Sequence, residues 1–66
     1  MIVTEKYLRF EGVLGDALAF VNAMREAQET GLEYPKVFND FMFSLEVALQ
    51  NEGVLDDDFN PVGGWK

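Results

Sequence analysis

One stretch of the chain decides the fold, and residues 35–53 contain it: PKVFNDFMFSLEVALQNEG. Pro35 suits the first position of a helix, where its missing N–H needs no partner. Gly53 is a natural left-handed stop at the other end. At about 100° per residue, the apolar side chains between these two residues cover one arc of roughly 140°. They are Val37, Phe38, Phe41, Met42, Leu45, Ala48 and Leu49. The pattern predicts a helix over residues 35–52 with one apolar face.

A second helix is predicted over residues 14–30. Gly15 and Asp16 place a small residue and an acid at its start, where the helix macrodipole favours negative charge. Gly31 is a stop of the same kind as the glycine after the other helix. The apolar face consists of Leu14, Ala17, Phe20, Val21, Met24 and Ala27. Only four residues separate the two helices, so we expect an antiparallel hairpin that forms the core.

The N-terminal segment has a different pattern. Residues 2–11, IVTEKYLRFE, are rich in β-branched and aromatic types. Tyr7 and Arg9 alternate with Leu8 and Phe10, which is typical of a half-buried strand. We therefore predict one short N-terminal strand.

A competing interpretation joins this segment to the first helix. Apolar residues from Val3 to Met24 follow a four-three spacing, as in one long helix. Gly12 and Gly15 argue against it, since each costs about 1 kcal/mol inside a helix. The predicted fold class is mainly α in the order β-α-α, and an all-α fold with a long first helix is the alternative.

The last part of the chain, residues 54–66, shows no periodicity and predicts an irregular acidic tail. Phe59 and Trp65 are apolar enough to anchor this tail on the helical hairpin. A length of 66 residues makes residues 1–66 a single small domain, and the absence of cysteine excludes a disulfide. A core of this size gains stability from self-association.

Two apolar residues lie outside the main arc of the second helix. Phe43 and Val47 are four apart, stacked on its back and flanked by polar residues. The N-terminal strand or the tail covers them, or they form a contact with a polar rim between two copies or with a partner. We predict a homodimer that uses this pair.

The charge balance restricts the partners. Twelve acidic residues against five basic ones give a formal charge of −7, which repels phosphate backbones and anionic lipids. We expect a basic protein partner and no direct binding to nucleic acid or membrane, although acidity also serves solubility alone. No segment approaches the roughly 20 apolar residues that span a bilayer, and the N-terminus lacks the pattern of a signal peptide. We expect a cytoplasmic protein.

Chemistry is limited by the residues that are missing. The chain has no histidine and no cysteine, so the usual catalytic triads and the usual zinc and haem ligand sets are excluded. Asp56-x-Asp58-x-Asn60 matches the opening ligands of a calcium loop, but Pro61 stands where that loop needs glycine. At most this spacing supports weak, adventitious calcium binding. We expect no enzyme activity, no cofactor and no resident metal.

The remaining signal is the distribution of carboxylates. From Glu26 to the end of the chain, only Lys36 and Lys66 are basic. An array of fixed carboxylates can stand in for phosphates and engage the arginines and lysines that normally hold a nucleic-acid backbone. The predicted partner-binding residues are Glu26, Glu29, Glu33, Asp40, Glu46, Glu52, Asp56, Asp57 and Asp58.

In length, charge, lack of cysteine and helical character, the chain resembles the small acidic inhibitors that bacteriophages and mobile elements encode against host nucleic-acid enzymes. Anti-CRISPR proteins and other DNA mimics are the best-known group. The resemblance implies an inhibitor whose acidic surface occupies a basic nucleic-acid-binding site on a target protein, in the cytoplasm of the host cell. The alternative is a small oligomeric interaction or accessory module without nucleic-acid mimicry.

Overall fold

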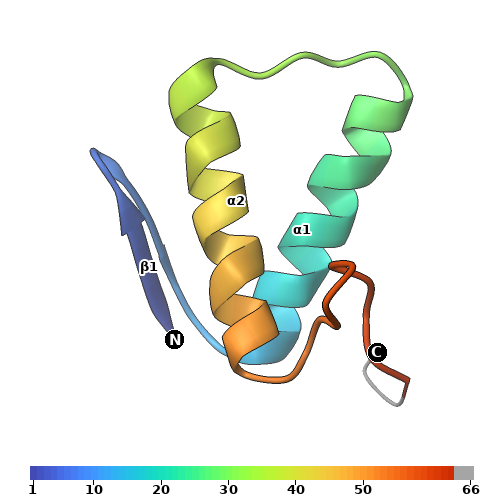
Figure 1. Cartoon of the computed structure of the whole chain (residues 1–66). Coiled ribbons are helices and arrows are strands. Elements are labelled where there is room, and N and C mark those ends of the chain that lie inside the picture. Colours follow the sequence, from blue (N-terminus) through green and yellow to red (C-terminus); the bar gives the residue numbers. More distant parts are fainter. Residues whose placement is uncertain (64–66) are drawn as a thin grey trace.

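Both predicted helices are present in the protein. The structure is a computed structural model that describes residues 1–63. Helix α1 spans Leu14–Glu29 and helix α2 spans Lys36–Asn51. Two short strands precede them, β1 over Ile2–Glu5 and β2 over Leu8–Glu11, so the order is β-β-α-α. Figure 1 shows the two helices running in opposite directions and diverging toward the loop that joins them.

The N-terminal segment is a β-hairpin, so the prediction of one strand over residues 2–11 is wrong. The strands pair antiparallel, with Glu5 opposite Leu8 beside the turn. The chain reverses at Lys6 and Tyr7, where Lys6 has a positive φ of 52°. Two-residue hairpin turns usually contain glycine or Asn-Gly. Lys6-Tyr7 contains neither, so the sequence gives no sign of a turn. The alternation of apolar and polar residues before and after it therefore resembles the pattern of one continuous strand. The paired strands also exclude the alternative of a long first helix.

The hairpin packs on α2 with the face that carries Val3, Leu8 and Phe10. Strand β1 makes most of this contact. At the turn end of the same face, the carboxylate of Glu5 accepts a hydrogen bond from Ser44 Oγ at 3.1 Å. The hairpin therefore extends the core on one side of α2, while its opposite face is open to solvent.

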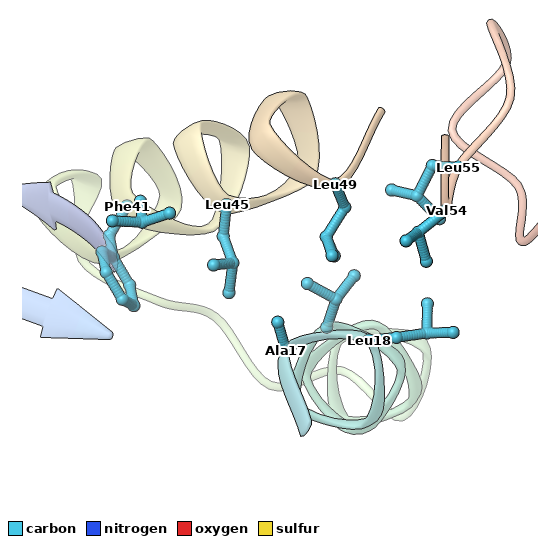
Figure 2. Packing of buried hydrophobic residues seen from close by; sticks show 9 residues of the cluster. Ala17, Leu18, Phe41, Leu45, Leu49, Val54 and Leu55 are labelled. Carbon is cyan, nitrogen blue, oxygen red and sulfur yellow. The ribbon is translucent and has the colours of Figure 1, made fainter. Parts of the chain in front are cut away.

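The centre of the core lies between the two helices. Phe41, Leu45 and Leu49 follow one another by one helical turn on α2, and all three are buried. Figure 2 shows Leu45 and Leu49 pointing toward Ala17 and Leu18 of α1, whereas Phe41 lies nearer the strands. Phe41, Leu45 and Leu49 all lie on the apolar arc that the sequence predicts for α2. The helical periodicity alone therefore identified these core residues. Leu18 was absent from the predicted face of α1, although only 2% of it is exposed.

Both helices end at a glycine in the left-handed conformation, as predicted: φ is 98° at Gly31 and 79° at Gly53. After α2, the N–H of Gly53 donates to the carbonyl of Gln50 at 3.0 Å, and the N–H of Val54 donates to the carbonyl of Leu49 at 2.9 Å. These two bonds form a Schellman motif, in which the residue after the glycine packs back on the last turn of the helix. The motif places Val54 in the same buried cluster as Leu49.

Residues 52–63, the described part of the segment after α2, contain neither helix nor strand, as predicted, but Val54 and Leu55 belong to the core. Val54 and Leu55 are buried, and Figure 2 places them at the end of the core above Leu18. Beyond them the chain folds back on itself. Leu55 pairs with Pro61 in an isolated antiparallel bridge, and the N–H of Val62 donates to the carbonyl of Val54 at 2.9 Å. The segment is therefore a closed loop that covers one end of the helix pair.

Candidate functional site

Three of the predicted partner-binding carboxylates gather where the helices are joined. Glu26 and Glu29 lie in the last turn of α1, and Glu33 lies in the connecting loop. All three residues are exposed, and none of the salt bridges in residues 1–63 engages them. The last turn of α1 contains no basic residue, so the negative end of the helix dipole has no compensating cation there. We refer to Glu26, Glu29 and Glu33 as the loop-end group.

A second group of carboxylates lies at the C-terminal end of α2. Glu52 is the C-cap of that helix, and Asp57 and Asp58 lie in the loop that follows. They are exposed, and no salt bridge of the described chain includes them. Helix α2, whose 16 residues span about 24 Å, begins shortly after Glu33 and ends just before Glu52. We refer to Glu52, Asp57 and Asp58 as the tail-end group. Six of the nine predicted acidic residues thus lie in two groups.

Asp40 and Glu46 differ from both groups because each is paired with a cation. Arg25 of α1 donates through Nε and Nη2 to Glu46, whose side chain is only 14% exposed. Lys36 donates to Asp40 at 2.8 Å, and this hydrogen bond raises the pKa of the Lys36 ammonium above its ordinary value. The four-residue spacing of the second pair is visible in the sequence, whereas only helix packing brings Arg25 to Glu46. The charges of both carboxylates are compensated inside the protein.

Asp56 has an internal role as well. Its Oδ1 accepts the N–H of Asp58 at 2.9 Å and the N–H of Asn60 at 3.0 Å. The N–H of Asp56 donates to the carbonyl of Asn60 at 2.8 Å. A short carboxylate that accepts backbone N–H groups two and four residues ahead stabilises a turn. The spacing Asp56-x-Asp58-x-Asn60 resembles the opening of a calcium loop. In the structure, Asp56 instead stabilises the turn in the segment after α2.

The predicted self-association pair is partly covered. Phe43 is 59% exposed on the back of α2, and Val47, one turn further on, is half-buried. Phe59 packs against the core, and its ring centroid lies 6.1 Å from that of Phe43. Trp65, the other predicted anchor of the tail, lies outside the described residues. The loop after α2 thus covers one side of this pair and leaves most of Phe43 open.

The described part of the chain presents surfaces and no enclosed site. Residues 1–63 hold no pocket, and no group of three or more acidic side chains among them is arranged to hold a metal ion. Within the same residues, no helix has both the length and the apolar character needed to cross a membrane. Among the predicted site residues, the loop-end group, the tail-end group and Phe43 remain open to a partner.

Comparison of the chain with models of protein families, with curated proteins and with solved structures finds no match.

Proposed function

We propose that the protein is an inhibitor that binds another protein and occupies its basic nucleic-acid-binding site with the two groups of carboxylates. One observation carries the proposal: six exposed carboxylates lie in two groups, and no salt bridge within residues 1–63 compensates them. Of the five basic residues, Arg9, Arg25 and Lys36 are already paired with acids of the same chain. The charge of −7 is therefore concentrated on surfaces that a partner can reach.

The separation of the two groups suits a surface that normally holds a nucleic-acid backbone. The length of α2, about 24 Å, corresponds to about seven base pairs of duplex at 3.4 Å each. A protein that binds such a length of duplex carries arginines and lysines spaced to meet successive phosphates. Carboxylates held on a folded scaffold form charge-assisted hydrogen bonds with those side chains without the entropic cost of ordering a flexible chain. Such an inhibitor acts in the cytoplasm, where its target handles nucleic acid.

Charge reversal in one group tests the proposal against a control with the same net charge. Glu33→Lys changes the charge by two units within the loop-end group. The control, Ile2→Lys with Thr4→Lys, adds the same two units on the exposed face of the hairpin and leaves both groups intact. Each variant is immobilised and exposed to a host-cell lysate treated with nuclease, and the retained proteins are identified by mass spectrometry.

We expect the unaltered protein and the control to retain a nucleic-acid-handling enzyme that added DNA or RNA releases. We expect Glu33→Lys to lose most of it, because reversal places a like charge against the basic site. Equal loss in Glu33→Lys and in the control would show that net charge alone governs binding. Retention of a protein that nucleic acid does not release would contradict the proposal.

A second function is favoured by the exposure of Phe43. The alternative is a small oligomeric interaction or accessory module in which Phe43 and Val47 contact a second copy or another protein. An aromatic side chain that is 59% exposed beside a polar rim suits the centre of a small interface. Phe43→Glu then yields a folded protein without the partner, since a charge buried in an interface is costly but is tolerated in water. Unchanged association in Phe43→Glu would contradict this alternative.

A further inference from the structure

The two-stranded sheet has an outer edge whose backbone groups are unpaired. Met1 and Gly12 exchange hydrogen bonds at the open end of the hairpin. Because bonded and non-bonded pairs alternate in an antiparallel ladder, the pair formed by Thr4 and Arg9 is non-bonded. The N–H and C=O groups of Arg9 and Glu11 therefore point away from β1, and no turn, loop or cap hydrogen bond of residues 1–63 uses them. This edge is a template for another strand.

The packing of the hairpin leaves this edge accessible. Strand β1 makes most of the contact between the hairpin and α2, and in the two-stranded sheet no further strand lies beside β2. In a sheet of order β1-β2-β2-β1, the two β1 strands are separated by three strand spacings, about 14 Å. Packed helices need only 8–10 Å between their axes. A second copy can therefore pair with β2 without a clash between the two α2 helices.

The β2 edge is complementary to itself. Antiparallel pairing of two copies around Phe10 places Arg9 of each copy opposite Glu11 of the other, and these are the residues whose backbone groups are free. Arg9 and Glu11 also form an exposed ion pair at 3.2 Å within each chain. In the dimer each of these side chains gains an opposite charge from the other copy on the same face of the sheet, which is stabilising. The same register brings Tyr7 toward Val13 of the other copy. At 79% and 65% exposed, they have the largest exposed fractions among the large apolar side chains of residues 1–63.

The side chains of the hairpin have no net charge, whereas the rest of the chain is strongly negative and repels a second copy. Over residues 1–12, Lys6 and Arg9 balance Glu5 and Glu11. Residues 13–66 contain the other ten acids and three bases, which gives the whole of the charge of −7. Two copies that meet at their hairpins therefore keep their acidic groups apart, whereas contacts through the helix ends bring like charges together.

From these observations we propose that two copies of this chain pair through the outer edge of β2 and form a four-stranded antiparallel sheet. The contact consists of four backbone hydrogen bonds between Arg9 and Glu11 of the two copies, two symmetric ion pairs and the contact of Tyr7 with Val13. It leaves the loop-end and tail-end groups of both copies exposed, and it uses a surface distinct from Phe43 and Val47.

Complementary charge variants test this contact. Arg9→Glu and Glu11→Arg each replace two opposite-charge pairs with like-charge pairs, and each should raise the dimer dissociation constant by about thirtyfold. A mixture of the two variants restores the opposite-charge pairs between unlike chains and should form heterodimers. Sedimentation velocity across the micromolar range measures all three samples, and circular dichroism confirms that each variant is folded. The proposal would be overturned if the protein without substitutions is monomeric at high micromolar concentration. Failure of the two variants to associate when mixed would overturn it as well.

Amide hydrogen exchange locates the contact independently of any variant. The amides of Arg9 and Glu11 should exchange more slowly as the protein concentration rises, because they become hydrogen-bonded between copies. The amides of Ile2 and Thr4, on the outer edge of β1, are the internal control and should exchange at the same rate at all concentrations. A dimer in which Arg9 and Glu11 gain no protection, and which Phe43→Glu disrupts, would assign self-association to the back of α2 instead.

Discussion

Replacing Gly53 with alanine tests how the C-terminal segment is attached to the core. The φ of Gly53 is +79°, and a Cβ added there would meet no atom within 4 Å. The cost of Gly53→Ala therefore comes from the backbone alone, and an L-residue in the left-handed region costs about 1 kcal/mol. At about 4–8 °C per kcal/mol for a domain of this size, we expect Tm to fall by about 4–8 °C.

Gly15→Ala is the matched control. It adds the same methyl group in equally open space, but Gly15 lies in the first turn of α1 and its φ is not positive. Removing a glycine from a helix stabilises it, here by about 0.5 kcal/mol because the position is near the helix start. We expect Tm to rise by about 2–4 °C in thermal unfolding followed by circular dichroism. If Gly53→Ala raises Tm as Gly15→Ala does, the left-handed turn that buries Val54 is absent and our account of the C-terminal segment fails.

Three further predictions concern single contacts. Arg25→Met should lower the free energy of unfolding in urea by about 1 kcal/mol, because it leaves the largely shielded Glu46 carboxylate without its partner; no change would mean that water replaces Arg25 without cost. Asp40→Asn should return the raised pKa of Lys36 toward its ordinary value in an NMR titration, since Asp40 is the main cause of the shift. Because the pKa of Lys36 is raised, the stability that this shift represents is present at neutral pH and is lost as pH rises through the raised pKa. Phe59→Ala should lower Tm because the ring packs against the core, and an unchanged Tm would show that the loop contributes nothing to stability.

The helices could be predicted from the sequence because their signals are local. The apolar arc of α2 and the glycines at 31 and 53 each act within a few residues, and the observed bounds differ from the predicted ones by one residue at most. The hairpin escaped prediction because its turn, Lys6-Tyr7, has no conventional turn residue and relies on a positive φ at Lys6. Pairing of the strands and packing on α2 stabilise a turn that the local sequence does not favour.

The burial of Val54 and Leu55 was missed for a different reason. Periodicity ends with the helix, so a search for apolar faces stops at Gly53. The missed signal was the residue after the helix-ending glycine, which in a Schellman motif packs on the last turn of the helix. Val54 after Gly53, with Leu49 on the preceding turn, fits that pattern.

The candidate site was predictable only in part. Exposure of the loop-end carboxylates follows from their place on the polar side of α1 and in the loop. The pairing of Glu46 with Arg25 depends on how two helices cross, and the sequence does not specify that. Asp56 accepts hydrogen bonds from its own loop, and composition does not separate such a residue from its exposed neighbours Asp57 and Asp58.

Competition with nucleic acid tests the proposed function most directly. The target recovered from the lysate is immobilised, and the protein and a DNA or RNA ligand of that target are added in both orders. We predict that each blocks the other, and that association of the protein slows steeply between low and physiological salt, since the Debye length falls from about 30 Å at 0.01 M to about 8 Å at 0.15 M. Simultaneous binding of the protein and the nucleic acid to one target molecule would contradict occupation of the nucleic-acid-binding site.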